Sequence, residues 1–158
     1  MPHQPLLLTI VAENEAIQPL PPYPEMLSEH LKGREKRSLG DPFGLSQFGV
    51  NLTSIAPGSH SSLHHRHSHQ DEFIFVLKGT LTLVSDGGEA ELRPGMCAGF
   101  KAGGAAHHLE NRENQVALLL EVGDRTACDV VEYPLHDLMI DQRADGSYRF
   151  CNKQGIPY

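Results

Sequence analysis

Two histidines and a carboxylate near the middle of the chain have the types and spacing that bind a metal ion. His65 and His67 are separated by one residue, so on a β-strand their imidazoles would project from the same face. Glu72 follows after a short polar turn, at the start of an apolar run. A third imidazole is available from His107, further down the chain. Imidazoles and a carboxylate that converge form a ligand set for a divalent transition metal.

The elements that must position these side chains are short strands with turns between them. Apolar, β-branched or alternating runs predict strands at 48–55, 63–67, 73–77, 80–84, 89–92, 96–100 and 116–122. Pro57-Gly58 and Asp86-Gly87-Gly88 are turn signals within this series. Short strands at even spacing with such turns indicate a sandwich or a barrel.

Two motifs in this region resemble those of the cupin family. The first motif is matched by Gly58, His65, His67, Glu72 and Gly79. The second is matched by Gly95, Gly103, His107 and Asn111. The departures are one extra residue before His65, one extra residue before His107, and Lys101 where proline is usual. The chain is therefore similar to cupins over residues 45–123.

The resemblance implies a fold and a ligand set. The fold would be all-β, a double-stranded β-helix or jelly-roll barrel with N- and C-terminal extensions. His65, His67, Glu72 and His107 would bind one divalent transition metal per chain, with Zn, Mn, Fe, Ni and Co all open. Four protein ligands leave two positions of an octahedron for water or substrate, which suits chemistry as well as structure.

Several polar residues near the predicted ligands are not expected to bind the metal. His64 and His108 adjoin ligands in sequence, so strand parity turns them to the opposite face, where solvent or packing roles are expected. Asp71 competes with Glu72, but Glu72 keeps the family's spacing to Gly79, and Asp71 is expected to be an outward hydrogen-bonding partner. No residue identifies itself as a catalytic base.

The barrel is expected to carry two extensions. Residues 1–44 form an N-terminal arm with a strand at 6–12, a proline-rich stretch, and a short helix at 25–32 that a glycine and a basic run end. Residues 124–158 form a C-terminal extension packed on the barrel. It has a strand at 129–133, an extended cap at 135–138 and a short strand at 148–150.

Net charge and cysteine content limit the partners and the cellular compartment that we expect for this protein. The chain has 158 residues and a net charge of −7, so nucleic acid and anionic membranes are not expected partners. Cys97, Cys128 and Cys151 form no C-x-x-C pair, and free thiols in a reducing cytoplasm are expected. The apolar run at 6–12 is too short for a signal peptide or a membrane span.

The resemblance favours a metal-dependent enzyme that acts on a small polar metabolite, with a sugar or sugar-phosphate isomerase as the leading hypothesis. The sequence shows no basic cluster in the barrel strands for a phosphate, and Lys101 and Arg112 are the nearest candidates. An Fe(II) dioxygenase is the alternative within the same class. A binding or sensor module without turnover is the alternative from another class, although all four ligand positions are present.

We predict a homodimer, because the two extensions are long relative to the barrel. They carry apolar residues that need a surface to cover, namely Leu6, Leu7, Leu8, Tyr23, Met26 and Tyr148. An exchanged strand would also protect a sheet edge. Light scattering at micromolar concentration should give twice the monomer mass, and a monomer mass would rule the prediction out.

Overall fold

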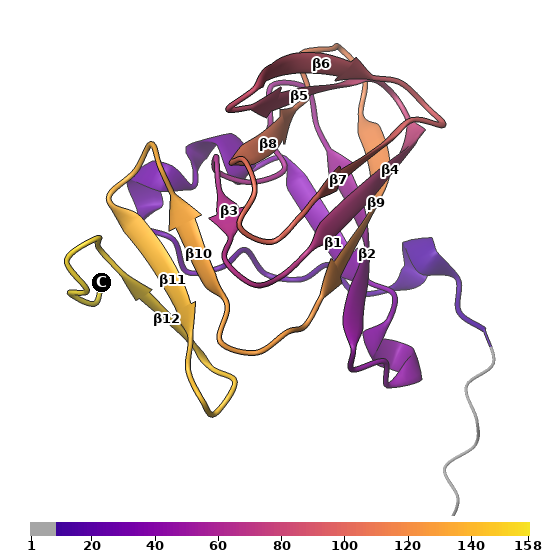
Figure 1. The fold of residues 1–158 in the computed structure, drawn as a ribbon. Helices are drawn as coiled ribbons and strands as arrows, with labels where there is room; N and C mark the ends of the chain where they lie inside the picture. Colours follow the sequence, from indigo (N-terminus) through magenta and orange to yellow (C-terminus); the bar gives the residue numbers. More distant parts are fainter. Residues whose placement is uncertain (1–8) are drawn as a thin grey trace, which may run out of the picture.

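A computed structural model describes residues 9–158, and these residues form an all-β fold with three sheets (Figure 1). The five-stranded sheet has the order β1-β2-β9-β4-β7, the three-stranded sheet β6-β5-β8, and the four-stranded sheet β12-β11-β10-β3. All pairings between named strands are antiparallel. This arrangement confirms the predicted jelly-roll barrel.

Most strands lie close to where the pattern of apolar residues placed them, but the strands at 34–38, 107–110 and 138–142 were not predicted. In the barrel they are β1 (Arg34–Ser38), β2 (Phe48–Ile55), β4 (Glu72–Lys78), β5 (Leu81–Ser85), β6 (Gly88–Leu92), β7 (Cys97–Phe100), β8 (His107–Glu110) and β9 (Ala117–Asp124). The four-stranded sheet adds β3 (Arg66–His67), β10 (Val130–Tyr133), β11 (Leu138–Gln142) and β12 (Tyr148–Cys151).

Alternation along the strands builds the barrel core. In β4, Ile74 and Val76 are buried, whereas Phe73 before them and Leu77 after them are exposed. The buried residues of this core come from β2, β4, β5, β6, β8 and β9, and are Ile55, Ile74, Val76, Leu81, Leu92, Leu109, Ala117 and Leu119. Because Glu72 and Ile74 are two residues apart on the same strand, their side chains share a face, and the carboxylate of Glu72 points into the barrel.

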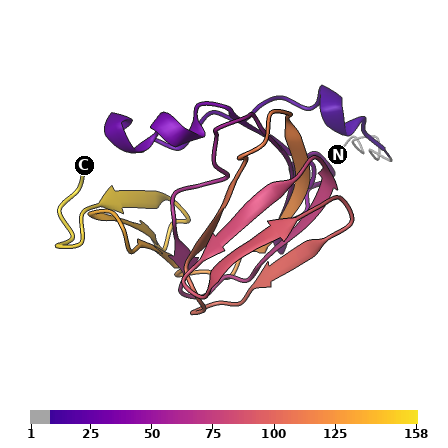
Figure 2. The same cartoon turned by 90° about the horizontal axis from the view of Figure 1, so that it is seen from above.

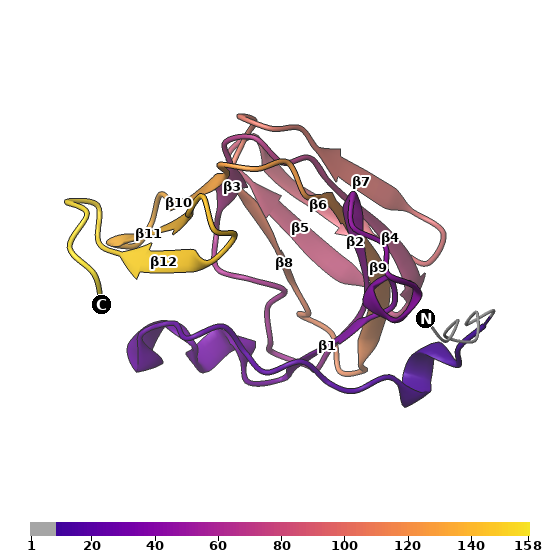
Figure 3. The same cartoon turned by 90° about the horizontal axis from the view of Figure 1, so that it is seen from below.

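A second apolar cluster joins the C-terminal sheet to the barrel and to the N-terminal arm. Its buried members are Leu63, Val131, Tyr133, Leu138 and Ile140, with Tyr23, Leu27 and Phe150 packed against them. Figures 2 and 3 show β10, β11 and β12 beside the barrel, with the arm crossing the molecule along one side. The strand β11 was not predicted, and it replaces the end of the extended cap expected at 135–138.

The N-terminal arm differs from the prediction in its local structure. Of the strand expected at 6–12, residues 6–8 lie outside the described residues, 9–11 are not in a strand, and Ala12 begins the 3-10 turn η1 (Ala12–Asn14). The helix expected at 25–32 is a pair of 3-10 turns, η2 (Glu25–Leu27) and η3 (Glu29–Leu31). Leu31 is fully buried, so one apolar anchor holds η3 where a full helical face is lacking.

The basic run after η3 is a strand and not only a helix stop. β1 pairs with β2 over its whole length, from Arg34 opposite Ile55 to Ser38 opposite Asn51. One further turn, η4 (Asp41–Phe43), leads into β2. All three cysteines are free, as expected. No helix in the described part of the chain is long and apolar enough to cross a membrane.

The turn at Gly79 provides a test of the barrel. Gly79 and Gly58 both have positive φ, 73° and 78°, but a Cβ on Gly79 would lie 2.8 Å from Cα of Ala117, whereas one on Gly58 would meet nothing within 4 Å. Gly58→Ala should lower the free energy of unfolding by about 1 kcal/mol through backbone strain alone. Gly79→Ala should cost roughly 1–3 kcal/mol more, because a backbone contact must move. Urea unfolding of both variants measures the difference, and equal losses would contradict it.

Candidate metal centre

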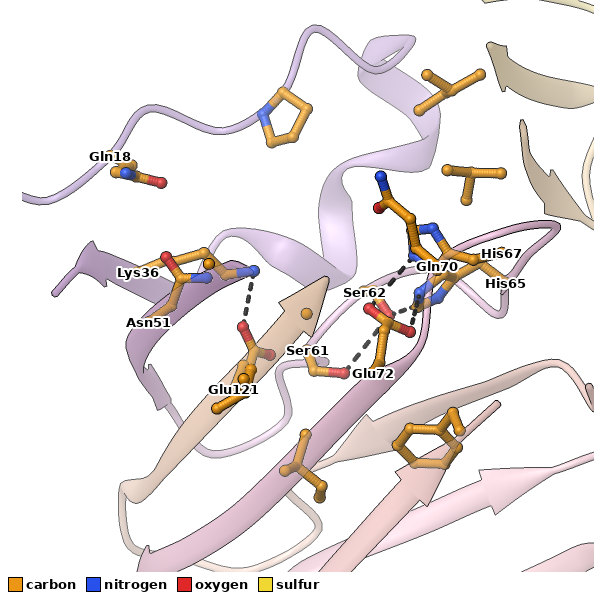
Figure 4. Close-up of a pocket in the computed structure, with 18 of the residues that line it drawn as sticks. Gln18, Lys36, Asn51, Ser61, Ser62, His65, His67, Gln70, Glu72 and Glu121 are labelled. Carbon is orange, nitrogen blue, oxygen red and sulfur yellow. Dashed lines mark hydrogen bonds and ion pairs between the residues drawn. The ribbon is translucent and has the colours of Figure 1, made fainter. Parts of the chain in front are cut away.

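Three imidazoles converge on one carboxylate inside the mouth of the barrel, and Figure 4 shows two of them, those of His65 and His67, beside Glu72. Nε2 of His65 lies 3.3 Å from Oε2 of Glu72, and Nε2 of His107 lies 3.1 Å from the same oxygen. Nε2 of His67 lies 3.3 Å from Oε1 of Glu72. Ligand atoms of His65, His67 and Glu72 are all within 4.8 Å of one another, and His107 adjoins this group through Glu72.

Strand pairing brings these residues together from distant parts of the chain. His65 and His107 form an antiparallel bridge in which each backbone amide donates to the other's carbonyl, at 3.1 and 2.8 Å. His67 lies on β3 opposite Val131 of β10. The ring of Phe100 stacks on His107, with centroids 3.4 Å apart and planes within 3°. The aromatic contact and the bridge fix the orientation of His107.

Hydrogen bonds at Nδ1 direct two of the imidazoles toward Glu72. Nδ1 of His65 donates to the carbonyl of Leu63 at 2.9 Å. Nδ1 of His67 donates to Oδ2 of Asp129 at 2.5 Å, and Oδ1 of Asp129 accepts the amide of His69 at 2.9 Å. A neutral ring protonated at Nδ1 has its lone pair on Nε2, which is the form that binds metal.

The donor set fits a cation. Neutral imidazoles protonated at Nδ1 present Nε2 lone pairs to a carboxylate that also only accepts, so the contacts lack a positive charge between them. Oε2 of Glu72 and Nδ1 of His107 are shielded from solvent and have no hydrogen-bond partner among the described residues. A divalent transition ion would satisfy the three Nε2 atoms and Glu72 together. Zn, Mn, Fe, Co and Ni ions could all accept such a ligand set.

The pKa shifts of the metal-free group also indicate that positive charge is needed beside Glu72. Burial raises the pKa of Glu72, but the three imidazoles that face its carboxylate outweigh burial and hold that pKa well below its ordinary value. Burial lowers the pKa of His67, but Asp129 and Glu72 outweigh it and raise the pKa to about 9. Burial lowers the pKa of His107. Without a metal, a proton on His67 therefore balances part of the carboxylate charge.

A cavity of about 570 Å³ opens beside the group. Its apolar wall includes Ile74, Leu109, Val122, Val131 and Ile140. Its polar side includes two cations of β1, Arg34 and Lys36, which share a face of that strand because they are two residues apart. Lys36 lies 2.7 Å from Oε2 of Glu121, and Figure 4 shows this pair across the cavity from His65 and Glu72.

The structure places the predicted residues as follows. The four predicted ligands, His65, His67, Glu72 and His107, face one another. His64 and His108 face away from them as expected, and of the solvent and packing roles expected for them both have the packing role, since both are buried and bonded to each other. Asp71 accepts the amide of Ala102 at 2.7 Å, as expected of a hydrogen-bonding partner.

Four polar residues of the site were missed by the sequence reasoning. These are Arg34, Lys36, Glu121 and Asp129. The alternation of the run Arg34–Ser38 could have placed Arg34 and Lys36 on one strand face, but Asp129 offers no local signal. Neither Lys101 nor Arg112 is among the described residues that line the cavity.

Comparison with known proteins agrees with this geometry. A family model described as a cupin domain matches residues 51–123. The structure of a sugar phosphate isomerase of the cupin superfamily from Silicibacter pomeroyi has 41% sequence identity and a TM-score of 0.88, covering 96% of each chain. This chain belongs to the cupin superfamily.

Two further structures resemble this cupin. An inferred sugar phosphate isomerase from Acidithiobacillus ferrooxidans has 32% identity and a TM-score of 0.71, covering 79% of this chain and 80% of its own. A polyketide cyclase from Streptomyces resistomycificus has 21% identity and a TM-score of 0.60, covering 75% of this chain and 79% of its own, which shows the fold alone. No curated protein matches the chain.

Asp129 is expected to tune metal affinity without being a ligand. In Asp129→Asn of this cupin, Oδ1 can still accept the amide of His69, but the amide nitrogen cannot accept from Nδ1 of His67. Metal binding should weaken about 10- to 100-fold. Asp124→Asn is the matched control, since Asp124 accepts two backbone amides nearby and no imidazole. Imidazole ¹⁵N resonances of His65 and His67 report binding, and equal affinities in both variants would contradict the expectation.

Metal uptake should release a proton over a wide pH range. With the pKa of His67 near 9 in the metal-free protein, this ring is protonated at pH 7 and must lose its proton to bind. Glu72, whose pKa is lowered, stays ionised and adds nothing to the slope. Apparent affinity should rise about tenfold per pH unit up to roughly pH 9 and then level off. Calorimetry in buffers of different ionisation enthalpy counts the proton, and a pH-independent affinity from 7 to 9 would refute the assignment.

Proposed function

We propose that this cupin is a metal-dependent isomerase that acts on a small phosphorylated sugar. The observation that carries the proposal is that one cavity contains both the imidazole–carboxylate group and an arginine with no carboxylate partner. The relative from Silicibacter pomeroyi, described as a sugar phosphate isomerase, supports the choice of substrate class. His65, His67, Glu72 and His107 are the residues proposed to hold one divalent ion.

Arg34 is the proposed receptor for the phosphate. Its Nη1 donates to the carbonyl of Ser61 at 2.7 Å, and its Nε is shielded from solvent without a partner. It makes no ion pair within the described residues, whereas Lys36 is paired with Glu121 and Arg125 with Asp41. An uncompensated guanidinium at a partly dry site favours an oxyanion, and its planar fork matches a phosphate.

Glu121 is the proposed base. Isomerisation moves one proton between the two carbons of a hydroxycarbonyl group and a second proton from the hydroxyl to the carbonyl oxygen. A bound divalent ion would make the carbon-bound proton more acidic by polarising the carbonyl. Lys36 and Thr53 both donate to Oε2 of Glu121, at 2.7 and 2.9 Å. These bonds orient the carboxylate and leave Oε1 to take the proton from one carbon and return it to the next.

Solvent exchange tests the reaction. Protein loaded in turn with Zn²⁺, Mn²⁺, Fe²⁺, Co²⁺ or Ni²⁺ is incubated in D₂O with aldose and ketose phosphates, and NMR follows deuterium at the carbon next to the carbonyl. Exchange with at least one phosphorylated sugar is expected, and Glu72→Gln and Glu121→Gln should abolish it. Oxygen consumption would instead support a dioxygenase. Saturable sugar-phosphate binding without exchange would support a sensor, and either result would overturn the proposal.

Arg34→Ala should act on substrate binding more than on turnover. Loss of a charge-assisted hydrogen bond worth about 1.5–3 kcal/mol should raise KM roughly 10- to 100-fold for the phosphorylated sugar. The same change should leave KM for the unphosphorylated sugar nearly unaltered. Arg37→Ala is the matched control, because Arg37 lies on the same strand, faces away from the cavity and pairs with Glu35. Equal effects on both sugars would remove Arg34 from the phosphate site.

A further inference from the structure

A second group of histidines and a carboxylate lies on the opposite face of β8 from His107. His108 and Glu110 are two residues apart on that strand, and Nε2 of His108 lies 2.8 Å from Oε1 of Glu110. His60, from the loop after β2, forms a bridge with Glu110, and its Nε2 lies 3.8 Å from the same oxygen. One ligand atom from each of the three residues lies within 4.8 Å of the others.

Hydrogen bonds behind His108 determine which of its nitrogens carries a proton. Nε2 of His64 lies 3.0 Å from Oδ1 of Asp86, and a carboxylate accepts, so Nε2 of His64 is protonated. Nδ1 of a neutral His64 then accepts from Nδ1 of His108, at 2.9 Å. The lone pair of a neutral His108 is therefore on Nε2, directed at Oε1 of Glu110, which also only accepts.

The contact between His108 and Glu110 thus needs a positive charge between its two acceptors. A proton on Nε2 of His108 would join that pair alone, whereas an ion bound at Oε1 of Glu110 could also take Nε2 of His60, which lies 3.8 Å from the same oxygen. A metal ion can accept all three as ligands. Burial lowers the pKa of His60, which keeps this ring in the neutral form that binds metal.

The surrounding charges favour a divalent cation. Arg112 binds Oε2 of Glu110 at 2.6 Å and both oxygens of Glu89 at 2.8 Å, so Oε1 of Glu110 stays available. With neutral imidazoles, Asp86, Glu89 and Glu110 outnumber Arg112, and Arg66, which also acts on Asp86, is paired with Glu132. The charge left over is negative and is located on the sheet face that holds the two imidazoles.

We infer that His60, His108 and Glu110 form a second site for a divalent transition ion, independent of the proposed isomerase. Two imidazoles and one carboxylate with a water in the fourth position is a common zinc ligand set. None of the three residues is among those lining the cavity, so the site is not expected to contact substrate. His30 of η3 stacks on His60, with centroids 4.6 Å apart and planes within 8°, and its carbonyl accepts the amide of His60 at 2.8 Å. The ion would fasten this loop to β8, and with it the N-terminal arm through the contacts between His30 and His60.

Zinc stoichiometry and position test the second site. Full-length protein without a histidine tag is stripped of metal and titrated with Zn²⁺ at pH 7.5. Wild type should bind two equivalents, and Glu110→Gln should bind one. Glu89→Gln should still bind two, because Glu89 also pairs with Arg112 but faces no imidazole. Glu72→Gln should bind one, and anomalous X-ray scattering should place that ion between His60 and His108.

Three results would overturn the second metal site. Wild type and Glu110→Gln with the same stoichiometry would overturn the site, as would anomalous signal in the barrel alone. Imidazole ¹⁵N resonances showing a doubly protonated His108 with Zn²⁺ present would mean that a proton occupies the position, which also overturns it. Where Glu110→Gln does not fold, His60→Ala serves, since it removes one ligand from a loop. Isomerase activity enters none of these readouts, so the two proposals can fail separately.

Discussion

The structure depends most on a carboxylate that is held among imidazoles where water cannot fully solvate it. Desolvation alone would favour the neutral acid in Glu72, and only the three facing rings keep its charge. Such an arrangement persists only if the surrounding backbone fixes each ring. The barrel provides this through the bridge between His65 and His107 and through the inward parity of Glu72 with Ile74 and Val76. The apolar core therefore positions the imidazoles and the carboxylate. Its packing fixes the register of the strands, and the register determines which side chains face one another.

The same alternation produces two chemically similar groups on opposite faces of one strand. His107 projects into the barrel, while His108 and Glu110 project outward toward the loop that holds His60. Both groups share one physical feature: a hydrogen bond at Nδ1 leaves Nε2 of a histidine facing a carboxylate. In the barrel the bond at His67 goes to Asp129, and outside it the bond at His108 goes to His64, which Asp86 orients. The outer carboxylate is also bound by an arginine, so the two groups need not hold a cation equally tightly.

The extensions contribute directly to the cavity. β1 belongs to the N-terminal arm and brings Arg34 and Lys36 to the cavity, while the C-terminal sheet supplies Val131 and Tyr133. Asp129, just before β10, bonds to His67 from outside the cavity lining. Tyr23 of the arm lies 3.1 Å, hydroxyl to hydroxyl, from Tyr133, so both extensions meet beside the proposed centre. In the proposed function the barrel would hold the metal and the extensions would select the substrate. This division explains why a barrel motif alone indicates a kind of chemistry but not what it acts on.

The sequence by itself determined most of the barrel strands, the convergence of His65, His67, Glu72 and His107, and the outward direction of His64 and His108. Each follows from local rules, since strand alternation and turn residues act between neighbours in the chain. The sequence-based prediction was wrong at η2 and η3, where packing of Leu31 and not helical periodicity holds the backbone. It was also wrong at β1, whose basic residues suggested the end of a helix, whereas in the structure they form a strand paired with β2. Only the tertiary structure could bring Asp129 to His67 and Arg34 to the cavity, or join His60 to Glu110. These contacts link residues far apart in sequence, and no local pattern encodes a distance that sheet pairing creates.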